Sequence, residues 1–167
     1  MLKHILLGGG RFATGMAMKK GLEIAFDYAL YPAVLIWLGY IWGGITMTAL
    51  AVVLNLLIIR AYDWAKVDWL FIEKLKYIRE DDSLELPWLL RWFRPLLKKG
   101  DIPAFFILSL DDPVTATLYL RKGAFKYNGL TRRDWNIFIA ANLVSNLYWI
   151  LGIAAMIESI KLIYRVA

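Results

Sequence analysis

Two adjacent carboxylates, Asp111 and Asp112, stand beside Pro113 in an otherwise apolar run of this 167-residue chain. Such a pair has three chemical uses: moving a proton or cation inside a membrane, binding magnesium through oxygen, or capping a helix. Because Asp followed by Pro is a favourable helix start, we expect Asp112 to cap a helix that begins at Pro113. A transport site at the two carboxylates is the alternative.

Four more polar residues lie within apolar segments, where such groups are costly unless they are paired or functional. They are Asp27, Asn55, Asn142 and Asn146. We expect Asn55 to form a hydrogen bond to Asn142 or Asn146 and thereby to fix a helical bundle. Together with Asp111 and Asp112, these four residues make up the predicted intramembrane polar site.

The sequence offers few other groups for catalysis or metal binding. It has no cysteine, and its single histidine, His4, lies near the N-terminus. This leaves no Ser/His or Cys/His catalytic set and no cluster of zinc ligands. Asp111 and Asp112 have no third carboxylate at a metal-binding spacing. We therefore expect a protein that is not an enzyme and that has no catalytic residues, no metal and no cofactor.

The composition indicates that lipid is part of the solvent. Sixty percent of the residues are hydrophobic, eight are tryptophan, and the mean hydropathy is +0.52. The net charge of +6 comes from basic residues that flank the apolar segments. This distribution is typical of cytoplasmic loops near anionic headgroups, so nucleic-acid binding is not expected.

The first apolar region, residues 24–61, contains only Asp27 and Arg60 as charged residues. A single helix of that length is too long for one crossing of a hydrocarbon core about 30 Å thick. The pair Gly43-Gly44 is expected to divide it, giving a transmembrane hairpin over residues 23–62 with helices 23–42 and 45–62. Basic residues at both ends place the N-terminus in the cytoplasm.

Residues 63–100 are predicted to be a cytoplasmic amphipathic segment. The helical period of the hairpin continues from Tyr62 to Ile78, with a polar break after it. Tryptophans and cations then alternate as in an interfacial helix. Four of the cations are expected to contact anionic lipid: Arg91, Arg94, Lys98 and Lys99.

Residues 102–121 are predicted to be a broken or re-entrant helix made of two halves, 102–110 and 113–121. If this segment crosses the membrane, the chain has four crossings and 15 of its 20 basic residues lie inside. If it re-enters or lies flat, there are three crossings and 18 lie inside. Charge favours three crossings. The apolar character of 103–110 favours four, which we expect.

The last spanning helix is predicted over residues 135–160, and residues 137–157 within it carry no charge. Thr131 is expected to cap this helix with Asp134 at its third position. A seam along one face is expected to pack against protein, because small residues allow membrane helices to approach closely. The seam consists of Ala141, Ser145, Tyr148, Gly152, Ala155 and Ser159.

Several short segments of the C-terminal half resemble a pattern of bacterial membrane proteins, which implies the inner membrane and carries no activity. They are residues 112–121, 129–130, 133–135 and 146–149. The sequence thus predicts an all-α, polytopic helical membrane protein with one membrane-embedded domain, residues 1–167. We expect a non-enzymatic accessory or assembly subunit whose partners are anionic bilayer lipid and other membrane subunits or further copies of itself. The alternative is a small ion or proton transporter or a pore, including a phage-type lysis pore.

Overall fold

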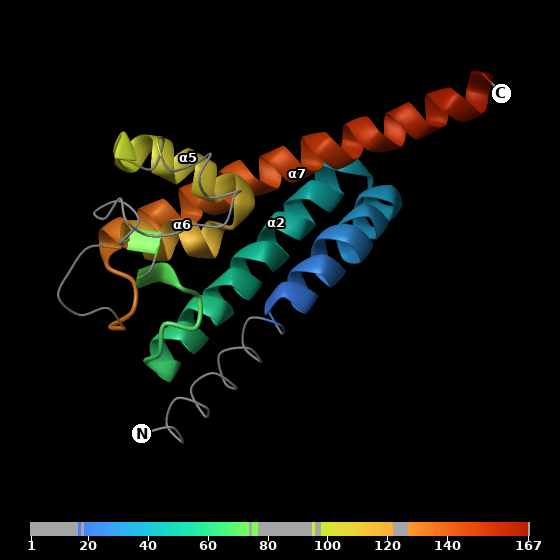
Figure 1. Cartoon of the computed structure of the whole chain (residues 1–167). Helices are drawn as coiled ribbons and strands as arrows, with labels where there is room; N and C mark the ends of the chain where they lie inside the picture. Colours follow the sequence, from blue (N-terminus) through green and yellow to red (C-terminus); the bar gives the residue numbers. More distant parts are fainter. Residues whose placement is uncertain are drawn as a thin grey trace.

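The computed structural model describes residues 17, 19–73, 75–76, 95, 98–121 and 127–166, and its elements are all helices (Figure 1). The elements are η1 (Ala25–Leu30), α2 (Tyr31–Ala65), α5 (Asp101–Asp111), α6 (Pro113–Leu120) and α7 (Arg132–Val166). The all-α class expected from the sequence is confirmed for this part of the chain.

The first long helical run, Lys19–Ala65, folds back on itself as a hairpin (Figure 1). The break lies at Gly39, whose φ of 76° and ψ of 171° define a region essentially restricted to glycine. The predicted break at Gly43-Gly44 is wrong, because both residues continue the second arm as helix. A Cβ on Gly43 would lie 3.0 Å from the Leu35 Cα of the first arm, so this glycine allows the two arms to touch.

The helix α7 packs along the hairpin. Gly44 allows close contact here, since a Cβ at this position would lie 2.9 Å from Cδ1 of Ile150. One core cluster of this interface contains buried side chains from both arms and from α7: Tyr31, Leu35, Met47 and Ile153. The C-terminal part of α7 extends past the hairpin turn, and Tyr164 near its end is 80% exposed (Figure 1).

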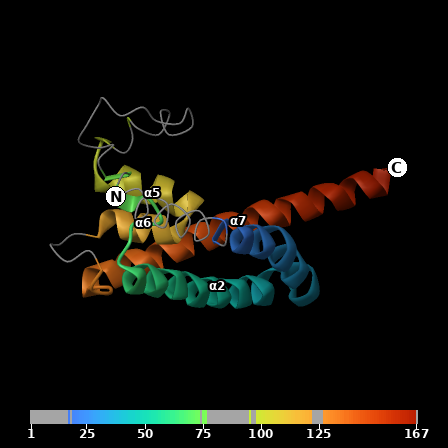
Figure 2. The ribbon, with the colours of Figure 1, turned by 60° about the horizontal axis from the view of Figure 1, so that its bottom comes forward.

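The predicted broken helix is confirmed as two short helices, α5 and α6, which are separated at Asp112. All residues of α6 except Thr115 are buried. The helix lies among α5, α7 and the second arm of the hairpin, as Figure 2 shows from below. Its apolar side chains are thus covered by the chain itself.

The two outer ends of the α5–α6 pair meet at one residue, Arg133. Its Nη1 donates to the carbonyl oxygen of Leu120 at 2.9 Å, where α6 ends. Its Nη2 lies 3.8 Å from the carboxylate of Asp101, where α5 begins. The pair therefore turns at Asp111 and Asp112 and returns to the level from which it starts.

The helix that the sequence predicts to continue from Tyr62 to Ile78 is interrupted. The helix α2 ends at Ala65, and both Lys66 and Phe71 have positive φ, 50° and 57°. The carboxylate of Asp68 then accepts hydrogen bonds from the backbone N–H groups of Ile72 and Glu73 at 2.8 and 3.0 Å, capping the next turn. The central part of the predicted amphipathic segment, 77–94, lies outside the described residues.

The predicted cap of the last helix is confirmed, and the helix begins three residues before the predicted position 135. Thr131 N donates to the Asp134 carboxylate at 3.0 Å, and Asp134 N donates to the Thr131 hydroxyl at 3.3 Å. This reciprocal cap begins α7 at Arg132.

By length and composition, two helices of the described chain can cross a membrane, Lys19–Ala65 and Arg132–Tyr164. Only 22% and 33% of their most apolar windows are buried. A helix from the core of a soluble protein is covered over most of its surface, so these values support membrane association.

Candidate functional site

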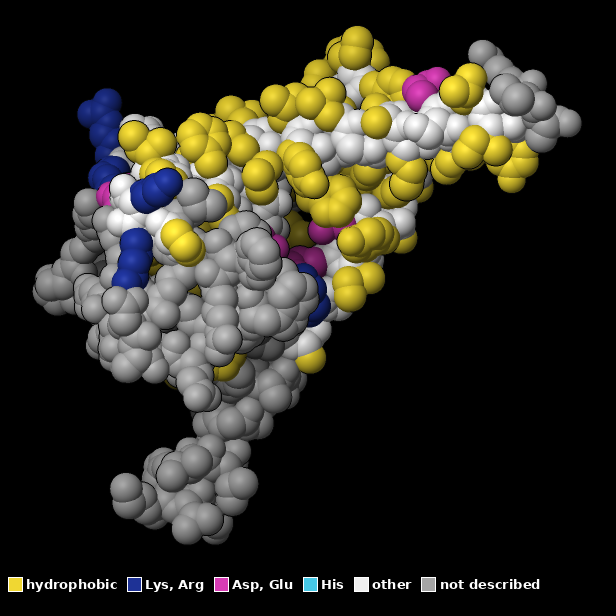
Figure 3. Space-filling view, turned by 45° about the horizontal axis from the view of Figure 1, so that its top comes forward, with side chains coloured by type: hydrophobic (Ala, Val, Ile, Leu, Met, Phe, Trp, Pro, Cys, Tyr) yellow, Lys and Arg dark blue, Asp and Glu magenta, His cyan; other side chains and the backbone are white. Residues whose placement is uncertain are grey.

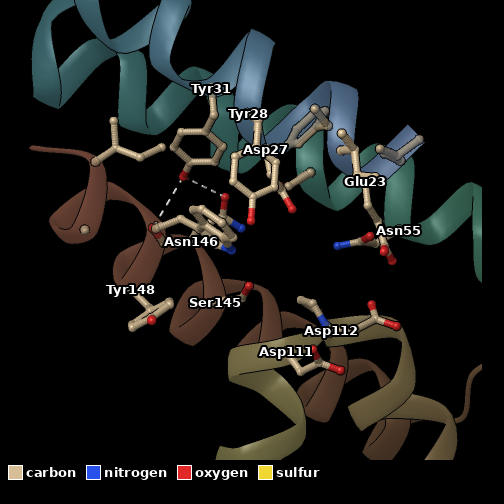
Figure 4. Close-up of a pocket in the computed structure, with 18 of the residues that line it drawn as sticks. Glu23, Asp27, Tyr28, Tyr31, Asn55, Asp111, Asp112, Ser145, Asn146 and Tyr148 are labelled. Atoms are coloured by element: carbon tan, nitrogen blue, oxygen red, sulfur yellow. Dashed lines mark hydrogen bonds between the residues drawn. The ribbon is translucent and has the colours of Figure 1, made fainter. Parts of the chain in front are cut away.

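A cavity of about 1060 Å³ opens between the hairpin, α7 and the turn between α5 and α6 (Figure 4). Much of its wall is apolar. Its polar lining comes from all three of these parts and consists of Lys20, Glu23, Asp27, Tyr28, Tyr31, Asn55, Asp111, Asp112, Ser145, Asn146 and Tyr148.

The six polar residues predicted to form an intramembrane site come together around this cavity. Five of them line it: Asp27, Asn55, Asp111, Asp112 and Asn146. The sixth, Asn142, is buried behind the wall and accepts a hydrogen bond from Asn55 Nδ2 to its Oδ1 at 2.8 Å. Of the two alternative partners predicted for Asn55, the structure shows the first. Residues up to 119 positions apart are thus brought to one place.

Asp112 caps α6, as the sequence predicts. Its Oδ1 accepts from the Val114 N–H at 3.0 Å, and its Oδ2 accepts from the Thr115 N–H at 3.1 Å and from the Thr115 hydroxyl at 2.5 Å. Lys19 Nζ donates to the same Oδ2 at 2.9 Å. Both carboxylate oxygens are therefore engaged in holding the turn.

Lys19 and Glu23 are charged residues beside Asp112 that the sequence did not single out. Lys19 pairs with Glu23 in the same helical turn and with Asp112 across 93 positions. Lys20 also reaches Glu23, at 3.1 Å. The i,i+3 and i,i+4 spacing was visible in the sequence, whereas the pair with Asp112 arises only when the hairpin packs against the α5–α6 turn.

A second polar network fastens α7 to both arms of the hairpin. Beyond the bond from Asn55 to Asn142, the Asn146 Nδ2 donates to the Asn142 carbonyl at 2.8 Å. The Tyr31 hydroxyl donates to Asn146 Oδ1 at 3.0 Å. Since Asn142, Asn146 and Tyr31 are buried, satisfied hydrogen bonds are required of them. This network stabilises the bundle.

Asp27 and Asp111 differ from their neighbours, because neither carboxylate has a hydrogen bond or an ion pair with the described chain. Asp27 lies in η1, a π-helical segment of the kind that often occurs at functional sites. Asp111 is an exposed residue that opens onto the cavity, although the protein around it removes part of its water. This burial, followed by the nearby charge of Asp112, raises the pKa of the Asp111 carboxyl above its usual range.

The predicted packing seam of α7 is divided. Ala141 and Ser145 are buried within the chain, whereas the other four members, Tyr148, Gly152, Ala155 and Ser159, are exposed. The predicted lipid contacts Lys98 and Lys99 are exposed just before α5. Arg91 and Arg94 lie outside the described residues.

Most polar groups of the cavity are already paired within the described chain. Among the described residues, no three His, Cys, Asp or Glu side chains are grouped closely enough to hold a metal ion. The carboxylates of Asp112 and Glu23 are engaged by lysines, and the asparagines bond to each other and to Tyr31. What remains is a partly apolar cavity with two unpaired carboxylates.

Comparison of the chain with protein-family models, with curated proteins and with solved structures gives no match.

Proposed function

We propose that the chain crosses the membrane three times, with the two arms of the hairpin and with α7. The meeting of Asp101 and Leu120 at Arg133 supports an α5–α6 pair that begins and ends on one side of the membrane, in place of the fourth crossing that we expected from the sequence. Three crossings also give the stronger charge bias, with 18 of the 20 basic residues on one side. That side is proposed to be the cytoplasm of a bacterial cell, where the N-terminus lies.

The depth in the membrane of the turn between α5 and α6, which carries Asp111 and Asp112, follows from helix length. Lys19 precedes Tyr40 by 21 residues, which corresponds to about 31 Å of helix and to one hydrocarbon core. Tyr40 and Glu158 form a hydrogen bond of 2.6 Å at the hairpin turn and mark one boundary. The ion pair of Lys19 with Asp112 then lies at the other boundary, where headgroups and water reach it.

Within this frame, the protein is proposed to be a non-enzymatic accessory or assembly subunit of a membrane complex. The observation that carries this proposal is the free face of α7, where Ala155 and Ser159 are exposed on a spanning helix beyond Gly152, which lines the cavity. Small residues at these spacings allow another helix to approach closely. Lipid tails gain less from such a face than a complementary helix does.

Cysteine crosslinking tests this function, because the chain has no cysteine of its own. Ala155→Cys is placed on the free face, and Leu147→Cys, which is 58% exposed on another face, is the matched control. A membrane-permeable photoreactive maleimide should join Ala155→Cys to one product of defined mass in native membranes. Products of equal yield at both positions, or none at either, would contradict the proposal.

One observation favours the alternative function, transport or pore formation. A second cavity of about 450 Å³ lies on the other side of the charged turn and shares four lining residues with the large one: Lys20, Glu23, Asp111 and Asp112. Two cavities that meet at charged groups resemble a path with a constriction. Flux of protons or potassium into proteoliposomes tests it, and conduction is rejected if no flux occurs or if D111N/D112N leaves it unchanged.

A further inference from the structure

The large cavity changes character along its length. The turn between α5 and α6 brings Asp111 and Asp112 to one end, beside Lys20 and Asp27 of the hairpin. Towards the hairpin turn its walls are apolar, with Leu151 and Met156 of α7. From Ser145 to Met156 the helix rises about 16 Å. Figure 3 shows the hollow between α7 and the hairpin, with acidic and basic side chains at its rim.

Three polar groups of this cavity have no hydrogen bond or ion pair with the described residues. The carboxylates of Asp27 and Asp111 lie on opposite walls, and neither is paired within the described chain (Figure 4). The Ser145 side chain, in a residue only 6% exposed, points into the same space and forms no hydrogen bond with the described residues. Because this hydroxyl opens onto the cavity, a molecule in the cavity is placed to supply its hydrogen bond.

The charge of the polar end is negative. Four carboxylates, those of Glu23, Asp27, Asp111 and Asp112, face two lysines, Lys19 and Lys20. Lys19 is engaged by Asp112 and Glu23, so the excess of negative charge falls on Asp27 and Asp111. A cationic group that enters this end of the cavity offsets one of the two excess negative charges.

We infer that this cavity binds a membrane lipid whose headgroup carries a primary ammonium group. The headgroup lies at the polar end of the cavity, where Asp27 and Asp111 are unpaired, and an acyl chain follows the apolar wall along α7. A primary ammonium has three N–H donors, which suit carboxylate and hydroxyl acceptors of this kind. Lys20, whose side chain is 72% exposed, is at hand for the phosphate of the same headgroup.

The direction of the cavity matches that of a lipid in one leaflet. Its charged end lies at the level of the Lys19 to Asp112 ion pair, which the helix lengths place at the membrane boundary. Its apolar walls extend from there towards the bilayer centre. The volume of about 1060 Å³ is comparable with that of pockets for small organic ligands. The inference requires the chain to lie in a membrane, but it does not require a protein partner.

Lipid binding is measured on the full chain by native mass spectrometry in mild detergent, with titration of three phospholipids that share acyl chains. Phosphatidylethanolamine, with a primary amine, should bind at least tenfold more tightly than phosphatidylcholine or phosphatidylglycerol. D27N/D111N should lose about tenfold or more of this affinity. Glu158→Gln, an acidic position outside the cavity, is the control that should retain it.

Folding and the source of the amine are checked in the same series. The isosteric D27N/D111N variant removes two unpaired charges, so its thermal unfolding temperature should not fall, which separates lost binding from lost structure. A soluble alkylamine is titrated in the same way, to test whether the amine alone is bound. The inference would be overturned if the chain bound the alkylamine but not phosphatidylethanolamine, if it bound the three phospholipids equally, or if D27N/D111N left binding unchanged.

Discussion

The helix α6 and the outer part of α7 are both rich in apolar residues, but their surroundings are opposite. Nearly every side chain of α6 is covered by α5, α7 and the hairpin. Along α7, by contrast, Leu143, Leu147, Leu151 and Ile163 are more than half exposed. In water, so much exposed apolar surface leads to aggregation. The helix α6 is therefore stabilised by contacts within the chain, whereas the exposed apolar surface of α7 favours lipid or a partner helix around it.

The charged contacts follow the same division. Arg121, at the end of α6, is buried and binds Asp63 of α2 with Nη1 at 2.7 Å and Nη2 at 3.3 Å. Glu158 and Lys161, on the projecting part of α7, form an exposed pair at 2.8 Å. Breaking these two pairs should therefore have very different effects.

The largest expected effect is that of Arg121→Ala. Removal of one partner leaves the Asp63 carboxylate in a poorly solvated place, so the free energy of unfolding should fall by about 3 kcal/mol or more. Lys161→Ala is the matched control, and it should change stability little, because water screens its pair. Unfolding in mixed micelles of mild detergent and SDS measures both variants, and equal losses would remove the distinction between the two regions.

The hairpin turn gives the next largest effect. Gly39→Ala forces a side chain into a backbone conformation that is essentially restricted to glycine, which should destabilise the chain by about 1–3 kcal/mol. Gly152→Ala is the control, since a Cβ there meets no atom within 4 Å and alanine favours helix. The same micelle titration compares them. A Gly39→Ala protein as stable as Gly152→Ala would place the turn elsewhere.

The two adjacent carboxylates should differ as well. Asp112→Ala removes the cap of α6 and the partner of Lys19, so stability should fall by about 1–2 kcal/mol. Asp111→Asn removes an unpaired carboxylate and should cause no loss. Thermal unfolding in mild detergent separates the two, and a greater loss from Asp111→Asn would reverse the roles given to them.

The smallest effect is a dependence on pH. Because the pKa of Asp111 is raised in the folded chain, its contribution is fully present below the ordinary carboxyl pKa of about 4 and is lost as pH rises through the raised value. Asp111→Asn should therefore gain stability relative to the natural chain between about pH 4 and pH 7. Paired melting curves at the two pH values measure this, and a constant difference between the proteins would contradict it.

Local patterns predicted the local structure well. The Asp112-Pro113 break and the cap formed by Thr131 and Asp134 each depend on side chains within three residues, and both are present. The hairpin was predicted from its length, but its turn was not, since Gly39 and the pair Gly43-Gly44 have equal freedom to break a helix. Only the packing of one arm against the other assigns these glycines their separate roles.

Long-range pairs account for most of what the sequence did not show. The six polar residues were selected because polar groups are costly in apolar segments, and they do gather at one cavity. Lys19 was not among them, because a lysine at a helix end is ordinary until its partner is known. The pair of Arg121 with Asp63 was missed for the same reason: each residue has nearer charges in the sequence.

The central claim is that lipid surrounds α7, and cysteine labelling tests it most directly. Leu147→Cys lies midway along the helix and is exposed in the chain, and Asn128→Cys lies in the exposed loop before α7. In membranes opened to both faces, a water-soluble maleimide should label Asn128→Cys readily and should leave Leu147→Cys unlabelled until SDS is added. Equal labelling of the two positions in the intact bilayer would show that water, and not lipid, surrounds α7.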